Sequence, residues 1–100
     1  MYYLYILFSS SAGKYYISHT DDPFRRLAKH NTSTFNTYTA KYRPWEITAL
    51  YQCGDSKSQA TRMEKFIKRQ KSRLFIEKLI RGEGLYGELA QLVRVPHVRD

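Results

Sequence analysis

The stretch at residues 15–31, YYISHTDDPFRRLAKHN, constrains the fold most, because a strand pattern runs directly into the start of a helix. Pro23 suits the first helical position, where the amide hydrogen that proline lacks would have no partner. Three preceding side chains can cap this helix: Thr20, Asp21 and Asp22. Arg26 and His30 lie four residues apart and therefore share one helix face. With a tyrosine of the strand, such as Tyr16, they can converge on an anionic group.

The remaining sequence predicts an α/β protein of the α+β type, a small three-stranded antiparallel sheet flanked by helices. Residues 2–8 are aromatic and aliphatic throughout, which favours a strand buried on both faces. Residues 9–13 have a turn composition, and residues 14–20 complete an antiparallel hairpin. Further on, the pattern predicts a third strand at residues 45–53, a helix capped by Ser56 and Gln59, and a shorter helix at residues 74–80.

Alternation along the strands assigns their faces. Period two gives Tyr5 and Tyr16 one face each of the first two strands, and their hydroxyls lie close together if those faces coincide. In the third strand, four apolar residues alternate with polar ones: Trp45, Ile47, Ala49 and Tyr51. This alternation predicts a single apolar face, and Leu50 interrupts it.

The chain carries a formal net charge of +8, which indicates an anionic partner. Nucleic acid is the first candidate and an anionic membrane surface the second. Basic residues crowd residues 57–81, where Glu64 and Glu77 are the only acidic ones. This asymmetry favours a surface that faces phosphates, although a solvated basic helix would have the same pattern.

Cys53 is the only cysteine, which excludes an intrachain disulfide and a cysteine-based zinc site. A lone thiol at the end of a predicted strand is typical of core packing in a reducing compartment. No apolar run approaches the ~20 residues of a membrane helix, and the first residues lack the features of a secretion signal. We therefore expect a cytoplasmic protein.

The composition changes after residue 82. Residues 83–100 contain Arg94 and Arg99 against three acidic residues, so nearly all of the positive charge lies in residues 1–82. We expect one domain at residues 1–82, followed at 83–100 by an appendage that is loosely packed or disordered.

An ordered set of motifs resembles the GIY-YIG nuclease superfamily. The set comprises LYIL at Leu4–Leu7, YIS at Tyr16–Ser18, Arg26, His30, and RMEK containing Glu64. More narrowly, residues 2–80 resemble the short single-domain bacterial members, which are related to the N-terminal nuclease domain of a bacterial excinuclease. Each triplet alone is a weak signal, but the order and spacing of the whole set are more specific.

The resemblance implies a role for each of five residues in phosphodiester cleavage. Tyr5 would be the general base, and Tyr16 would orient water or phosphate. Arg26 would clamp the phosphate, His30 would support it by hydrogen bonding, and Glu64 would be the ligand of one Mg²⁺ or Mn²⁺. The residue types suit these roles, because a guanidinium binds phosphate bidentately and a carboxylate suits Mg²⁺.

Each of these residues also has a simpler interpretation. The tyrosines can be core aromatics, and Glu64 can pair with Lys68 at i,i+4 for ~0.3–0.5 kcal/mol. His19 is interpreted as a structural or rim residue. Tyr38 and Trp45 could stack on bases, but packing in the core or a loop is the simpler assignment. Six basic residues are candidates for contacts with the nucleic-acid backbone: Lys41, Arg43, Arg62, Lys65, Lys68 and Arg69.

Three features depart from the pattern of the superfamily. The first triplet is Tyr3-Leu4-Tyr5, which keeps only its tyrosine. Ser18 stands where the family has glycine, which would introduce a steric cost if the backbone there had a positive φ. The downstream asparagine of the family has no counterpart, because no asparagine follows Asn36.

Our leading hypothesis is therefore a metal-dependent endonuclease domain that hydrolyses phosphodiester bonds in DNA, with RNA not excluded. Selectivity would come from substrate structure or from a larger repair protein as partner. The alternative is a catalytically inactive nucleic-acid-binding module on the same fold, and a third hypothesis is an adaptor that docks on a repair complex. Salt-sensitive binding without cleavage in any divalent metal would distinguish the binding module from the nuclease.

Overall fold

The computed structural model describes residues 1–32 and 38–96. The strands are β1 (Tyr2–Ser9), β2 (Lys14–Thr20), β3 (Trp45–Gly54) and β4 (Val93–Arg94). The helices are α1 (Pro23–Thr32), α2 (Tyr38–Lys41), α3 (Lys57–Arg69), α4 (Arg73–Ile80) and the 3₁₀ helix η1 (Gly87–Leu89). No helix in these two ranges is long and apolar enough to cross a lipid bilayer.

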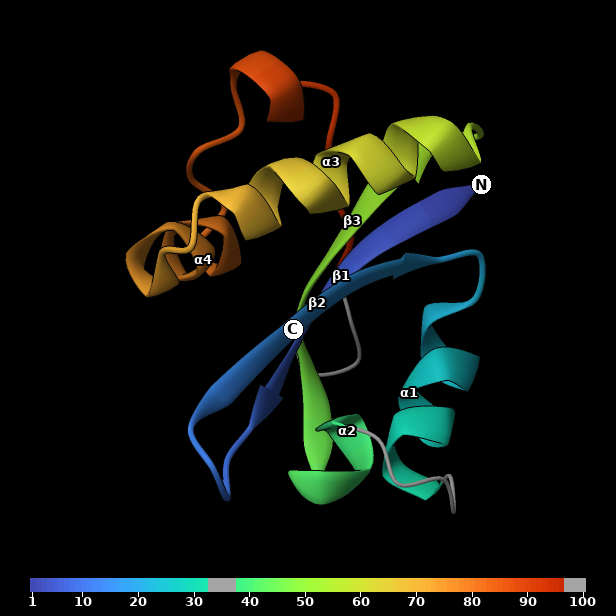
Figure 1. Ribbon diagram of the computed structural model, residues 1–100. Coiled ribbons are helices and arrows are strands. Elements are labelled where there is room, and N and C mark those ends of the chain that lie inside the picture. Colours follow the sequence, from blue (N-terminus) through green and yellow to red (C-terminus); the bar gives the residue numbers. More distant parts are fainter. Residues whose placement is uncertain (33–37, 97–100) are drawn as a thin grey trace.

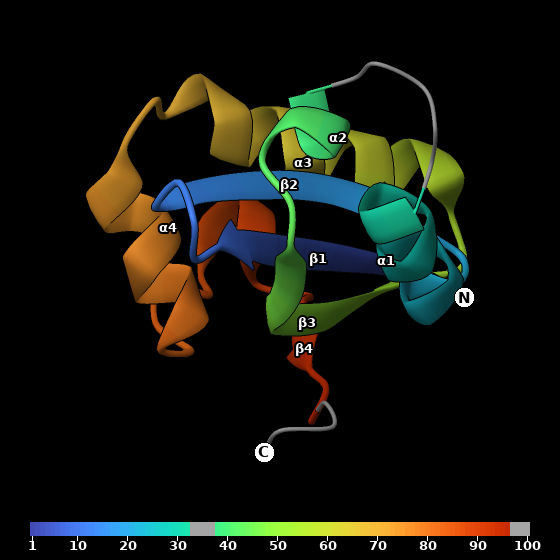
Figure 2. The ribbon, with the colours of Figure 1, turned by 90° about the horizontal axis from the view of Figure 1, so that it is seen from below.

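The described residues form an α+β fold around a four-stranded antiparallel sheet with the strand order β2-β1-β3-β4. Helices α3 and α4 cover one face of the sheet, and α1 and α2 cover the other (Figures 1 and 2). Two apolar clusters lie on these two faces, one around Leu4 and Ile6 and one around Tyr5 and Leu7. The strand β1 is therefore buried on both sides, as its unbroken apolar run predicts.

The prediction of three strands is wrong, because β4 adds a fourth. Val93 pairs with Gln52, and the amide of Val95 donates a hydrogen bond to the carbonyl of Leu50 at 2.8 Å. The segment that contains β4 also places Leu89 and Leu92 in the core, where they are 1% and 5% exposed.

The packing of residues 85–95 thus differs from the loosely packed or disordered appendage that the charge distribution suggested. Charge composition reports on solvated surface, whereas two leucines spaced for burial decide whether a segment docks. Residues 97–100 lie outside the described residues, and the division of the chain at residue 82 stays a prediction.

A bulge in β3 corrects the expected faces of this strand. Ile6 pairs with Ala49, but the next residue, Leu7, pairs with Ile47, so Thr48 is an extra residue. An extra residue reverses the alternation beyond it. As a result the apolar residues of β3 divide between the two faces: Trp45, Ile47 and Leu50 on the α1 side, and Ala49, Tyr51 and Cys53 on the α3 side.

The predicted helix starts are confirmed. The amide of Arg25 donates to Oδ1 of Asp22 at 3.2 Å, so Asp22 caps α1 directly before Pro23. The side chain of Ser56 accepts a hydrogen bond from the amide of Gln59 at 3.2 Å and caps α3. These local caps fix where α1 and α3 leave the sheet, and hence where their polar side chains lie.

Candidate active site

A buried hydrogen bond joins β1 to α1. The hydroxyl of Tyr5 lies 3.0 Å from Nε2 of His30, and the two residues are 0% and 7% exposed. Directly across the hairpin from Tyr5 lies Ser18, so Tyr16 shares the face of Tyr5, which strand alternation alone left open. The ring of Tyr16 meets that of His30 edge-on, with the centroids 5.0 Å apart.

Burial shifts both members of this pair towards their neutral forms. Burial raises the pKa of Tyr5, and hydrogen bonds from Arg26 and Ser18 offset only part of this rise. Burial, reinforced by the charge of Arg26, lowers the pKa of His30 to about 4. At neutral pH the tyrosine is therefore protonated and the imidazole is uncharged. The Tyr5 hydroxyl donates to His30 in the tautomer that leaves Nε2 free of hydrogen.

Arg26 is half-buried beside this pair, and its Nε is buried without a hydrogen-bond partner in the described part of the chain. It lines a cavity of about 490 Å³ with Ser18, His19 and Lys57. Arg25 lines the same cavity and pairs with Asp21 and Asp22 at 3.8 Å. A half-buried guanidinium with an unused donor, facing a polar hollow, is suited to bind an anion.

Glu64 lies against the other face of β2. Its Oε1 is 2.6 Å from Nδ1 of His19, its Oε2 accepts a hydrogen bond from Lys68 at 2.8 Å, and the side chain is 15% exposed. Burial alone would raise the pKa of Glu64. The hydrogen bonds from Lys68 and His19 and the positive charge of Lys68 outweigh this effect and hold the pKa below its ordinary value. Glu64 is therefore an anion at neutral pH.

His19 is a site residue that sequence reasoning assigned only a structural or rim position. The two-residue period of the strand could have shown that His19 faces away from Tyr16. His19 pairs with Leu4 and so faces the α3 side, opposite to Tyr16 and Ser18. The helix containing Glu64 packs on that side.

The two halves of the site meet at the edge strand. Tyr5, Arg26 and His30 lie on the α1 side of the sheet, whereas Glu64 lies on the α3 side. Lys68 connects them, because its Nζ binds Glu64 and also lies 5.9 Å from the ring centroid of Tyr16.

The six basic residues predicted to contact nucleic acid do not share one surface. Lys65, Lys68 and Arg69 are exposed on α3, but Arg62 lines a separate cavity beside η1, with Gly87. Lys41 is exposed and lies 5.4 Å from the ring centroid of Tyr42.

Arg43 is half-buried, and its Nε donates to the carbonyl of His30 at 2.8 Å, so it holds the end of α1 in place. Trp45 is buried and its indole donates to the carbonyl of Thr39 at 2.6 Å, which confirms the packing assignment for this residue. The side chain of Tyr38 lies outside the described residues. Lys57, which lines the cavity of Arg26, is a basic residue that the predicted set omitted.

The donor set around Glu64 fits a hard divalent cation only as a single-carboxylate site. Within the described residues, no group of three or more His, Cys, Asp or Glu side chains could hold a metal ion. Mg²⁺ is commonly bound by one or two carboxylates together with water and substrate phosphate. An anionic, partly exposed Glu64 meets this requirement once the exposed Lys68 leaves Oε2.

With this geometry in place, comparison with known proteins decides the family. The family model of the GIY-YIG catalytic domain matches residues 1–78. The chain belongs to the GIY-YIG family. Members of this family are typically endonucleases that act on DNA and generally depend on divalent metals, so the fold is of a nuclease type.

A solved structure extends the likeness beyond the family match. The chain is 32% identical to a UPF0213 protein from Bacillus halodurans, whose solution NMR structure it matches with a TM-score of 0.50. The match covers 91% of this chain and 95% of that one. Among curated proteins, no significant match is found.

The GIY-YIG fold accommodates Ser18 without backbone strain. Ser18 pairs in regular register with Tyr5, and among the described residues other than glycine only Lys71 has a positive φ, of 48°. The steric cost expected for serine in place of glycine therefore does not arise from the backbone conformation. The Ser18 hydroxyl instead adds a hydrogen bond that lowers the pKa of Tyr5.

Proposed function

We propose that this chain is a metal-dependent endonuclease domain that hydrolyses phosphodiester bonds in DNA. The observation that carries the proposal is the buried Tyr5–His30 hydrogen bond beside the guanidinium of Arg26, with an anionic Glu64 across the edge strand. A neutral proton acceptor, a fixed cation and a metal-binding carboxylate are the groups that hydrolysis of a phosphate diester requires.

In this proposal Tyr5 and His30 act together as the general base. Tyr5 takes a proton from the attacking water and passes its own proton to Nε2 of the neutral His30. Arg26 favours the loss of the proton from Tyr5, because its hydrogen bond and its charge both lower the pKa of Tyr5. The same charge lowers the pKa of His30, so His30 holds the proton only transiently. Tyr5 has no exposed surface, so water reaches its hydroxyl only when a covering side chain moves. Arg26 is the neighbour that a bound phosphate would draw away.

Arg26 and Glu64 have different electrostatic roles in the proposed reaction. Arg26 neutralises the phosphate with the charge of its guanidinium at the cavity that it lines, and Tyr16, half-buried beside His30, orients the phosphate or the water. Glu64 would hold one Mg²⁺ or Mn²⁺, with His19 fixing the orientation of the carboxylate. When bound, such an ion supplies Lewis-acid stabilisation of the developing negative charge.

The proposal includes selectivity for substrate structure and a role in repair or recombination. These rest on the extent of the candidate site, whose residues lie on β1, β2, α1 and α3. A catalytically inactive binding module is less favoured. A partly exposed carboxylate near a phosphate site weakens phosphate binding by repulsion, and Glu64 is held anionic.

The test is a nicking assay with Mg²⁺ or Mn²⁺ on single-stranded, flapped, branched and fully paired DNA. We expect cleavage of at least one of these substrates, and a loss of at least a hundredfold in rate in Glu64→Gln and in Arg26→Ala. Lys78→Ala, an exposed basic residue of α4, is the matched control and should retain the full rate. Full-rate cleavage by Glu64→Gln or Arg26→Ala, or no cleavage in any divalent metal, would overturn the proposal.

A further inference from the structure

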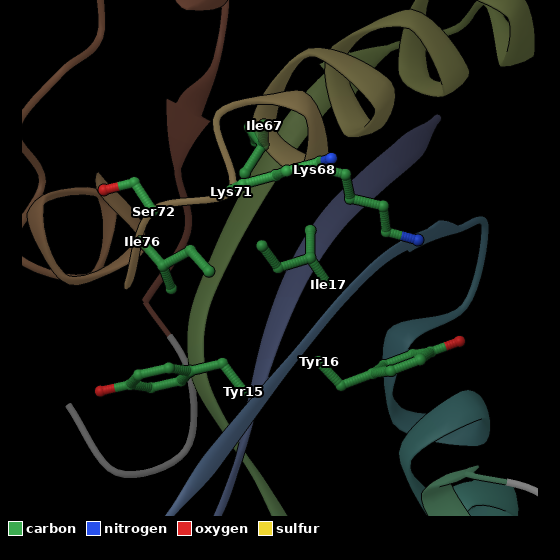
Figure 3. A pocket seen from close by; sticks show the side chains of 8 residues that line it. All are labelled: Tyr15, Tyr16, Ile17, Ile67, Lys68, Lys71, Ser72 and Ile76. Carbon is green, nitrogen blue, oxygen red and sulfur yellow. The ribbon is translucent and has the colours of Figure 1, made fainter. Parts of the chain in front are cut away.

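A groove of about 380 Å³ lies between the edge strand β2 and the junction of α3 with α4 (Figure 3). Three isoleucines line it, and their side chains lie between the strand and the two helices: Ile17, Ile67 and Ile76. Lys68 and Lys71 line the same groove and are exposed. Its volume is within the range of small-molecule sites, and its walls combine apolar surface with two cations.

The groove is continuous with the candidate active site. Tyr16 and Lys68 line it, and Lys68 reaches from α3 towards the strand on the side of Tyr16 (Figure 3). The Lys68 ammonium is 2.8 Å from Glu64, so a molecule in the groove ends beside the carboxylate. The cavity of Arg26 begins two residues further along the same strand, at Ser18.

We propose that this groove binds the base of the nucleotide next to the scissile phosphate, in a DNA strand that follows the edge of β2. The inference rests on the proposed nuclease function and specifies its substrate. A nucleobase offers a flat apolar face to the half-buried Ile76, above a floor formed by Ile17 and Ile67, which are 5% and 2% exposed. The phosphates on either side of the base meet Lys71 and Lys68. A paired base is stacked in its helix and presents only its edges to a protein. The base in the groove is therefore unpaired and unstacked.

Lys71 supplies the second positive charge of the groove. It links α3 to α4 with a left-handed backbone, φ 48°, which places a lysine at the mouth of the groove at a conformation that lysine rarely adopts. Asparagine tolerates that conformation better, so Lys71→Asn removes the charge without adding backbone strain.

The experiment measures binding in EDTA, so that it does not depend on cleavage. Fluorescent single-stranded oligonucleotides carry one abasic site, which is moved along the strand while the number of phosphates stays constant. We expect one position to weaken binding about tenfold, and this position to adjoin the bond that is cut in Mg²⁺. Lys71→Asn should weaken the binding of all oligonucleotides a few-fold. It should also reduce the number of counterions released on binding, read from the salt dependence of the affinity, by about one.

Two further variants test whether the base lies in this groove. Ile76→Ala should reduce the penalty of that abasic position to less than threefold, whereas Leu74→Ala, exposed on the same helix, should leave it unchanged. Equal penalties at all positions, or the same penalty in Ile76→Ala and in the wild type, would overturn the groove proposal. Cleavage without a position-specific penalty rejects the groove but not the nuclease. A position-specific penalty without cleavage rejects the nuclease but not the groove.

Discussion

Nδ1 of His19 lies 2.6 Å from Oε1 of Glu64, and this short contact ties the end of the edge strand to α3. Lys68 holds the other oxygen of the same carboxylate at 2.8 Å. A carboxylate that is engaged through both oxygens has a fixed orientation. The imidazole is the less exposed of the two partners, so we regard His19 as the residue that positions Glu64.

Replacing His19 should therefore affect both stability and ion binding. We expect His19→Ala to lower the free energy of unfolding by about 1–3 kcal/mol, because a hydrogen bond to a charged group is lost. The affinity of the free protein for Mn²⁺ should fall as Glu64 loses its orientation. Urea unfolding and titration calorimetry measure the two effects. Thr61→Val, which removes a 3.4 Å contact to Nε2 of His19, should cost less than about 1 kcal/mol. If His19→Ala kept the unfolding free energy and the Mn²⁺ affinity of the wild type, His19 would not be the residue that positions Glu64.

Two buried tyrosines provide a matched test of Tyr5 as part of the general base. Tyr5 and Tyr51 are both 0% exposed, and each hydroxyl is hydrogen-bonded to a buried group, that of Tyr5 to His30 and that of Tyr51 to the carbonyl of Leu79 at 2.7 Å. Tyr5→Phe and Tyr51→Phe should each lower the free energy of unfolding by about 1–3 kcal/mol. Only Tyr5→Phe should abolish nicking, since Tyr51 lies on the other face of the sheet. Equal rates in the two variants would exclude Tyr5 from the chemistry.

Local signals account for the part of the site that sequence could predict. The cap at Asp22 and the proline after it set the start of α1. Strand alternation gave Tyr5 and Tyr16 one face each, and the register of the hairpin makes these faces the same. These features depend on residues close together in the sequence, or on one hairpin. Family membership then singled out Arg26 and Glu64, which helical spacing alone could not distinguish from a solvated surface.

The features that sequence did not predict depend on contacts between distant segments. The extra residue Thr48 in β3 shows only in its pairing with β1, and β4 lies in a segment whose Leu89 and Leu92 dock on the core. His19 was placed at the rim because its partner, Glu64, is 45 residues away.

The pH dependence of stability should reveal the buried His30. Its pKa falls from 6.5 in the unfolded chain to about 4 in the folded one, so between these values only the unfolded chain binds the proton. Stability therefore decreases as the pH falls from 6.5 to 4, by up to about 3 kcal/mol. Urea unfolding at several pH values should show this loss in the wild type and not in His30→Gln. The carboxylates of the chain contribute equally to the pH dependence of both proteins. Parallel curves of stability against pH in the wild type and His30→Gln would therefore contradict the burial of a neutral His30.

Lys68 should compete with a divalent ion for Glu64. Lys68→Met leaves Oε2 of Glu64 open, so Mn²⁺ should bind the free protein several-fold more tightly, while stability changes by less than about 1 kcal/mol. Titration calorimetry without DNA measures this affinity. Lys65→Met, an exposed lysine of the same helix, controls for the loss of one positive charge. Unchanged or weaker binding in Lys68→Met would contradict the competition, and binding that survives Glu64→Gln would place the ion elsewhere.

The segment after residue 82 should contribute to the stability of the domain. Leu89 is 1% exposed and belongs to the cluster on the α3 side of the sheet, so Leu89→Ala removes buried apolar surface and leaves a cavity. We expect the free energy of unfolding to fall by about 2–5 kcal/mol. Val93→Ala, at a residue of the same segment that is 58% exposed, should change it by less than about 1 kcal/mol. If both variants unfold at the urea concentration of the wild type, residues 83–96 are an appendage after all, because a segment that docks on the core cannot lose a buried leucine without effect.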